Sequence, residues 1–126
     1  MTFPPRVVVT GSDADVEPEL ISRREGHRST VVWTTGGEFE PGERAIPGGT
    51  VFRIAEFSPG VASARHRTET VDYGVVVSGE IDLVLDDKTL HLSAGDVFVQ
   101  CGTWHDWVNN GEEPCVIAFC LVGTPR

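Results

Sequence analysis

Positive charge, cysteine and long apolar runs are all scarce in this sequence. Ten Lys and Arg residues stand against nineteen Asp and Glu residues, so the formal net charge is -9 at pH 7. A field of that sign repels phosphate backbones and anionic membrane surfaces, so we expect neither nucleic acid nor membrane as a partner. The cysteines Cys101, Cys115 and Cys120 include no C-x-x-C pair. That pattern indicates reduced thiols with a mainly packing role rather than a disulfide framework or a zinc site.

Targeting and membrane-spanning segments are also absent from the sequence. The longest apolar stretches, such as 115–122, fall far short of the roughly 18 residues that a membrane span requires. The first six residues lack the basic segment and apolar region of a secretory signal. We therefore expect a cytoplasmic protein. Its 126 residues fit one domain, and a hydrophobic fraction of 40% predicts a packed core.

Helical periodicity is missing as well, and short strand patterns take its place. They combine apolar-polar alternation with β-branched runs, and clusters of Gly, Pro, Asn and Asp separate them. We predict strands at 6–10, 29–34, 50–57, 74–77, 80–85, 89–92, 97–100 and 116–122. Many short strands at close spacing indicate an all-β sandwich or barrel.

The two parts of the chain differ in composition. Residues 1–49 are more polar and richer in Gly and Pro, which predicts N-terminal strands and a long loop packing on a barrel formed by 50–126. A single short helical turn is predicted within 11–26. We expect one structural domain overall, in which the clearest hairpin spans 80–92 around the turn at Asp86 and Asp87.

Two of the four histidines lie where a turn meets a strand. His66 lies in a stretch from Gly60 to Gly79, G-V-A-S-A-R-H-R-T-E-T-V-D-Y-G-V-V-V-S-G. This stretch resembles the first motif of the cupin family, G-x5-H-x-H-x3,4-E-x6-G. Both glycines and the first His match, whereas Thr68 stands at the second His and Asp72 at the Glu.

The second stretch contains His105. From Gly95 it reads G-D-V-F-V-Q-C-G-T-W-H-D-W-V-N, which is similar to the second cupin motif, G-x5-P-x-G-x2-H-x3-N. Gly102, His105 and Asn109 match in spacing. Gln100 replaces the Pro, and Gly95 is one residue closer to that position than the spacing of the motif specifies. The resemblance covers about 50–122.

This resemblance implies a double-stranded β-helix, the cupin or jelly-roll barrel, whose motif side chains point into the lumen and usually hold a divalent metal ion. Here the implied metal ligands are His66, Asp72 and His105. Strand geometry agrees, because residues 66, 68 and 72 share one parity and alternate side chains of a strand face the same side. Glu69, a rival carboxylate, has the other parity.

The resemblance also implies a function. Two imidazoles and a carboxylate leave coordination positions open on Fe, Mn, Ni, Co or Zn. We expect a metal-dependent cupin enzyme that acts on a small organic molecule as a dioxygenase, isomerase, dehydratase or decarboxylase, with Thr68, Asp72 and His105 as catalytic residues. Thr68 is a poor ligand, and its hydroxyl suits a metal-bound water or a substrate oxygen. The alternatives are a non-catalytic binding cupin that has lost its metal and a metal-free acid/base enzyme.

The remaining predictions concern the pocket walls and assembly. Arg53 would clamp a carboxylate or enolate if it faces the lumen, and Trp107 shares the parity of His105 and would contact either ligand or core. His27 and His91 have no motif around them and are predicted at the surface. Strand 6–10 would expose unpaired backbone groups at an edge, so we expect it to help form a homodimer.

Overall fold

The computed structural model describes residues 2–11, 14–39 and 45–124, which form eleven strands and no helix. No helix long and apolar enough to cross a membrane occurs within these ranges. The strands are β1 (Val7–Val9), β2 (Ala14–Val16), β3 (Ile21–Arg24), β4 (His27–Thr35), β5 (Thr50–Phe57), β6 (Thr70–Ser78), β7 (Glu80–Val84), β8 (Thr89–Ser93), β9 (Val97–Cys101), β10 (Asp106–Val108) and β11 (Cys115–Gly123).

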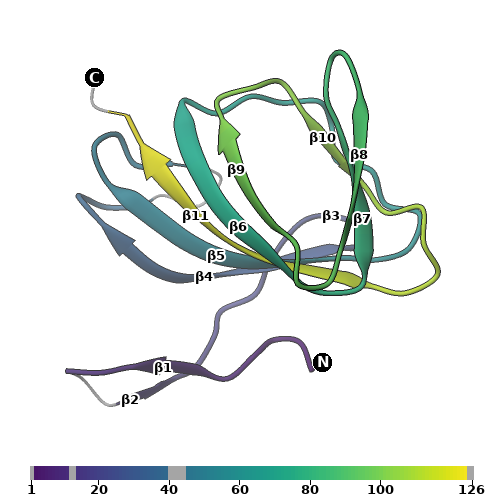
Figure 1. Ribbon diagram of the computed structural model, residues 1–126. Helices are drawn as coiled ribbons and strands as arrows, with labels where there is room; N and C mark the ends of the chain where they lie inside the picture. Colours follow the sequence, from purple (N-terminus) through teal and green to yellow (C-terminus); the bar gives the residue numbers. More distant parts are fainter. Residues whose placement is uncertain (1, 12–13, 40–44, 125–126) are drawn as a thin grey trace.

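Two antiparallel sheets form the barrel (Figure 1). One has six strands in the order β3-β4-β5-β11-β6-β9, and the other has three in the order β10-β7-β8. The predicted all-β barrel is therefore confirmed. Each strand predicted from the sequence lies within or overlaps an observed strand, while β2, β3 and β10 were not predicted.

The burial pattern of strand β5 shows which face of the larger sheet points into the barrel. Val51, Arg53 and Ala55 are buried, whereas Phe52, between the first two, is exposed. Residues directly opposite one another on neighbouring strands share a face. The pairing of Ile117 with Ala55 therefore places β11 side chains in the same core.

The main core lies between the two sheets. Ile81 and Val76 are at most 1% exposed, and Ile117 is fully buried. Burying one such side chain contributes about 1.5 to 3 kcal/mol. The buried members of this cluster are Ala55, Phe57, Val76, Ile81, Leu83, Trp107, Cys115 and Ile117. A second, smaller cluster of Ile46, Val51 and Leu121 fills the other end of the barrel.

Gly79 makes the turn that takes the chain from the larger sheet to the smaller one. Its φ is +77°, which a residue with a side chain rarely adopts. A Cβ at this position would lie 2.4 Å from the carbonyl oxygen of Pro114. This final glycine of the first motif therefore has a structural role, because only glycine meets both requirements.

The N-terminal region departs from the prediction in one respect. The helical turn predicted within 11–26 is wrong, since the described residues there contain β2 and β3. Gly26, with a φ of +80°, allows a tight turn that pairs β3 with β4 and joins both to the barrel sheet. Strands β1 and β2 form a separate two-stranded sheet that lies apart from the barrel (Figure 1).

Candidate functional site

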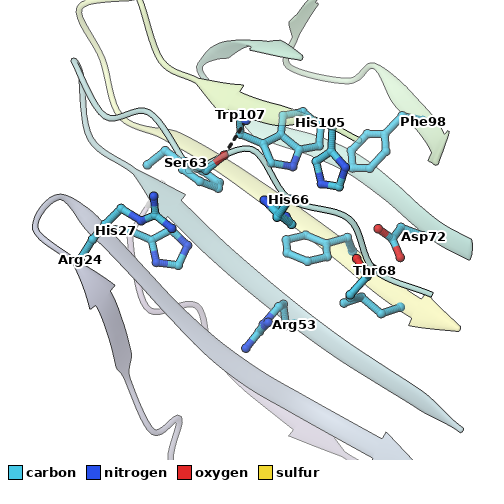
Figure 2. A pocket seen from close by; sticks show the side chains of 13 residues that line it. Arg24, His27, Arg53, Ser63, His66, Thr68, Asp72, Phe98, His105 and Trp107 are labelled. Atoms are coloured by element: carbon cyan, nitrogen blue, oxygen red, sulfur yellow. Dashed lines mark hydrogen bonds between the residues drawn. The ribbon is translucent and has the colours of Figure 1, made fainter. Parts of the chain in front are cut away.

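A pocket opens inside the barrel, and all six residues that the sequence suggested for a site line it. These six are His66, Thr68, Asp72, His105, Arg53 and Trp107. Figure 2 shows them converging on one space from strands and loops that are distant in the chain. The other residues that line the pocket are Arg24, His27, Phe57, Ser63, Phe98, Phe119 and Leu121.

His66 and His105 form the centre of one end of this pocket. They face each other in an isolated antiparallel bridge, and each backbone N–H donates to the other's carbonyl at 3.0 Å. Their imidazole ring centroids are 4.2 Å apart. The backbone thus holds together two side chains that are 39 positions apart in the sequence.

The two imidazoles, whose planes are inclined by 64°, are each held through Nδ1 by a backbone carbonyl two residues earlier in the chain. Nδ1 of His66 is 2.8 Å from the carbonyl oxygen of Ala64, and Nδ1 of His105 is 2.8 Å from that of Thr103. A carbonyl oxygen only accepts hydrogen bonds, so each neutral ring carries its proton on Nδ1. Each Nε2 therefore has a lone pair, as a metal ligand or a general base requires.

Asp72 is the buried carboxylate at this end, with 7% of its surface exposed. The hydroxyl of Thr70 donates to Asp72 Oδ1 at 2.6 Å, and Gln100 Nε2 lies 3.4 Å from Oδ2. Burial raises the pKa of Asp72 above its ordinary value, although the hydrogen bond from Thr70 and the proximity of His105 oppose the shift. Glu69, the rival carboxylate, is exposed and does not line the pocket.

Gln100 is a site residue that the sequence reasoning treated only as a replacement for a turn proline. Its Nε2 lies 3.0 Å from His105 Nε2, which has a lone pair to accept an N–H. It also lies 2.9 Å from His105 Nδ1, whose proton goes to the carbonyl of Thr103. One amide nitrogen therefore bridges His105 and Asp72. The pairing of Asp72 with Gln100 across β6 and β9 puts both on one face.

The side chains at this end have the types of ligand atom that a divalent metal ion binds, but these atoms do not converge on one point. Within residues 2–11, 14–39 and 45–124, no three His, Cys, Asp or Glu side chains are close enough together to hold a metal. His66 and His105 supply Nε2 lone pairs and Asp72 a carboxylate, which is an appropriate donor set. Two of these three groups, however, already accept hydrogen bonds from Gln100.

Two arginines line other parts of the pocket wall. Arg53, on β5, is only 5% exposed, and its guanidinium lies over the ring of Phe39 at 5.9 Å. Arg24, on β3, is opposite His27 in the pairing of β3 with β4, and it donates from Nη1 to the carbonyl oxygen of Ala62 at 3.1 Å. Arg53 therefore faces the lumen, and Arg24 is a pocket residue that the sequence did not suggest.

The prediction that His27 lies at the surface is wrong. This residue lines the pocket, and its ring packs against Phe57 at a centroid distance of 5.0 Å. His27 is opposite Phe57 in the pairing of β4 with β5, so both side chains face inward. His91, by contrast, is exposed as predicted, and it bonds to Asp82 outside the pocket.

Trp107 belongs to both the core and the pocket wall. It is 8% exposed, and its ring lies 5.1 Å from that of Phe98 and 6.3 Å from that of His105. Asn109, the last residue of the second motif, is fully buried and does not line the pocket. Its Nδ2 donates to the carbonyls of Phe57 and Glu113 at 3.0 and 2.9 Å, so it joins β5 to the β10–β11 connection.

Comparison with known families decides the classification. The family described as Cupin_2, a cupin domain, matches residues 53–122. The chain belongs to the cupin family. The solved structure of KdgF from Halomonas sp. superposes with a TM-score of 0.62 over 82% of this chain and 87% of that one, at 22% identity. At that identity the likeness concerns the fold alone.

Among characterised sequences, this cupin is similar to proteins of fungal origin. It is 56% identical over 69 residues to phomopsin biosynthesis cluster protein C' of Diaporthe leptostromiformis, covering 54% of this chain and 36% of that protein. It is 40% identical over 87 residues to the cupin-domain-containing oxidoreductase fogC of Aspergillus ruber, covering 66% and 42%. The matched part thus spans well under half the length of either relative.

Proposed function

We propose that this cupin is a metal-dependent enzyme domain that acts on a small organic molecule held in the barrel pocket. One observation carries the proposal. The imidazoles of His66 and His105 lie side by side, and each is held by a carbonyl at Nδ1 so that Nε2 has a lone pair. Similarity to the cupin-domain-containing oxidoreductase fogC favours an enzyme over a storage or structural role.

In this proposal His66, His105 and Asp72 hold the metal ion. When bound, the ion supplies Lewis acidity or redox capacity, as in dioxygenation, isomerisation, dehydration or decarboxylation. Asp72 Oδ2 has only a long contact of 3.4 Å with Gln100, while its Oδ1 bond to Thr70 fixes the carboxylate in place. The hydroxyl of Thr68 lines the same pocket and orients a substrate oxygen by hydrogen bonding.

The enclosed, largely apolar pocket supports the same proposal. The phenyl rings of Phe57, Phe98 and Phe119 and the indole of Trp107 line it. Such walls exclude bulk water and strengthen every electrostatic contact that a bound molecule makes. A small molecule would therefore meet both aromatic surface and polar side chains, and the polar side chains would determine its orientation.

A second candidate function is a binding cupin without metal. The bridge that Gln100 forms between Asp72 and His105 supports it, because the amide engages two groups that a metal would need. The Thr at position 68 supports it too, because a neutral hydroxyl is a weak replacement for an imidazole ligand. In this alternative the pocket holds its ligand without transforming it.

Metal analysis of the natively purified protein separates the two candidates. We expect about one equivalent of a divalent transition metal per chain in the wild type, and its loss in His66→Ala and His105→Ala. His91→Ala is the matched control, because His91 is an exposed imidazole outside the pocket. A wild type that stays metal-free after reconstitution with Fe, Mn, Ni, Co and Zn in turn would refute the metal-dependent proposal and favour the binding cupin.

We also infer that the protein forms a homodimer through the outer face of the six-stranded sheet. This face carries exposed apolar residues, with Val97 76%, Val99 64% and Tyr73 54% exposed. Their strands β9 and β6 pair directly, with Val99 opposite Tyr73, so the three form a continuous patch. Such a patch on a soluble protein generally marks an interaction surface.

The separate β1–β2 hairpin supports a second copy of this chain as the partner on that face. A two-stranded sheet is marginally stable by itself in water, yet this one lies apart from the barrel. Its Val8 is 50% exposed and Val16 is 39% exposed. Exchange of hairpins between two copies would cover the apolar surfaces of both. Light scattering during gel filtration should give twice the 13.7 kDa chain mass, and Val99→Lys should reduce it to one chain.

A further inference from the structure

Position 74, in the middle of β6, holds a glycine on the inward face of the larger sheet. Asp72 and Val76, two residues away on either side, are buried side chains on that face. A glycine inside a strand lowers stability, because it loses more conformational freedom on folding and has no side chain to pack. Gly74 does not have a positive φ, so its backbone conformation does not require glycine. Its presence must therefore have another cause.

The cause is the ring of Phe98. This residue lies directly opposite Gly74 in the pairing of β6 with β9. A Cβ at position 74 would lie 2.1 Å from Cζ of Phe98, and 2.5 and 2.7 Å from its two Cε atoms. Nonbonded carbon atoms prefer separations of about 3.5 to 4 Å, so a side chain here would displace the ring. Gly74 thus allows the phenyl group of Phe98 to lie over the backbone of β6.

Phe119 extends this aromatic surface on the other side of Gly74. It is opposite Gly74 in the pairing of β11 with β6, so Phe119, Gly74 and Phe98 form one row across three neighbouring strands. Residues in such a row share a face of the sheet. Both phenyl groups line the pocket, and both are only partly buried although they face inward. This row, which we call the aromatic ledge, leaves ring surface uncovered inside the barrel.

Trp107, on β10 of the smaller sheet, lies next to the aromatic ledge. Its ring is 5.1 Å from that of Phe98 at a tilt of 56°, and 6.3 Å from the imidazole of His105. Figure 2 shows Phe98, Trp107 and His105 close together at one side of the pocket. Aromatic rings attract one another in offset and tilted arrangements with centroids about 4.5 to 7 Å apart. A flat ring can therefore contact both the ledge and Trp107, whereas a puckered saturated ring cannot lie flat against either.

We propose that the pocket binds a planar, unsaturated ring, which lies against the aromatic ledge and Trp107. Phe98 is then a specificity-determining residue, because it selects a flat ring over a saturated ring of the same size. That this ring belongs to the substrate, with its reacting atom near His66 and His105, rests on the proposed function. The binding of the ring itself does not.

NMR titration of the chelator-treated, metal-free protein with benzyl alcohol and cyclohexylmethanol tests the proposal. The two probes share a hydroxymethyl group and a six-membered ring, and apolar burial alone would favour the more hydrophobic cyclohexylmethanol. We expect benzyl alcohol to bind about two- to tenfold more tightly, as contacts between aromatic rings predict. Phe98→Leu should abolish this preference, and Phe119→Leu should reduce it. Phe52→Leu is the matched control, because Phe52 is an exposed phenyl group on the outer face of β5.

Gly74→Ala provides a second test, in which the ledge keeps its rings but loses its geometry. The added methyl group would push the ring of Phe98 toward the pocket, so both probes should bind about tenfold more weakly, in line with the cost of overpacking. In the Phe98→Ala background the same change should leave both affinities as they were, because no ring remains to be displaced.

Circular dichroism and thermal melting check that each variant folds. If Phe98→Leu does not fold, Phe119→Leu and Gly74→Ala carry the test. The proposal is overturned by a wild type that binds both probes equally, prefers cyclohexylmethanol or binds neither. A preference that survives in folded Phe98→Leu, or unchanged affinities in folded Gly74→Ala, would contradict it as well. Because the titration uses metal-free protein, a failure to bind metal would refute the proposed function without changing this result.

Discussion

The two ends of the pocket are built in different ways. His66 and His105 lie in segments between strands and are held by one isolated backbone bridge. Arg24, His27 and Arg53 lie within regular strands of one sheet. At the histidine end the polar groups bond to one another and to carbonyls. Arg53 instead lies over the ring of Phe39, and Arg24 donates to the carbonyl oxygen of Ala62. The positions of the two histidines therefore depend on loop geometry, whereas the positions of the two arginines depend on strand pairing.

The largest expected effect comes from replacing Asn109, and it tests whether one barrel framework supports both ends of the pocket. Asn109 bonds to the carbonyl of Phe57, at the end of β5, and to that of Glu113. Asn109→Ala leaves these acceptors without partners, so it should lower the free energy of unfolding by about 2 to 3 kcal/mol. Urea denaturation measures this loss. Asn110→Ala is the control, because exposed Asn110 bonds only to the side chain of Asp82 among the described contacts.

Because the same barrel positions His66 and His105, Asn109→Ala should also weaken metal binding at temperatures near the midpoint of unfolding. A variant that loses stability but keeps full metal affinity there would show that the histidine end does not depend on this link.

Replacing Gln100 should change metal affinity at the histidine end, and this effect is of intermediate size. Gln100→Leu removes the amide that bridges Asp72 and His105 but keeps most of the side-chain volume. Because the two acceptors become available, we expect the affinity for Mn²⁺ to rise by about tenfold. Titration calorimetry measures this affinity. A fall in Mn²⁺ affinity of about 10 to 100-fold would instead identify Gln100 as a residue that supports the ligands.

The smallest expected effect concerns His91, a surface imidazole whose ring is held in a different way from the pocket imidazoles of His66 and His105. His91 bonds at Nδ1 to the carboxylate of Asp82 at 2.7 Å, not to a carbonyl. The hydrogen bond that His91 donates to Asp82 raises the pKa of His91 above 6.5, and the hydrogen bonds that Asp82 accepts from Asn110 and His91 lower the pKa of Asp82 below 3.8. The contribution of His91 to stability is therefore complete below pH 6.5 and is lost as the pH rises through its raised pKa.

For Asp82 the sign is opposite: its contribution is present above pH 3.8 and is lost as the pH falls through the lowered pKa. Imidazole titration by NMR should give a pKa above 6.5 for His91, and Asp82→Asn should lower it. An unchanged titration in that variant would mean that the contact with Asp82 is not formed in solution.

Motif spacing was sufficient to predict one end of the pocket. The positions of His66, Thr68, Asp72 and His105 follow from the glycine framework and from period-two alternation, and all four line the pocket. The fold followed from the same turns and strands. Whether His66, Asp72 and His105 bind a metal stays a prediction, because no three such side chains converge among the described residues.

The rest of the site could not be predicted because it depends on register. His27 faces the pocket only because β4 pairs with β5 as it does, and Gln100 reaches Asp72 and His105 only because β6 pairs with β9 as it does. A shift by one residue would turn both side chains away. The bulge in β4 between Val31 and Trp33 changes the alternation again. No local pattern in the sequence encodes these pairings, and Arg24 lies in a strand that itself was not predicted.

One measurement tests the central claim most directly: an anomalous difference map from crystals grown with Mn²⁺. The account predicts a peak between the Nε2 atoms of His66 and His105. A map whose only peak lies outside the barrel, for example beside His91 and Asp82, would contradict the account.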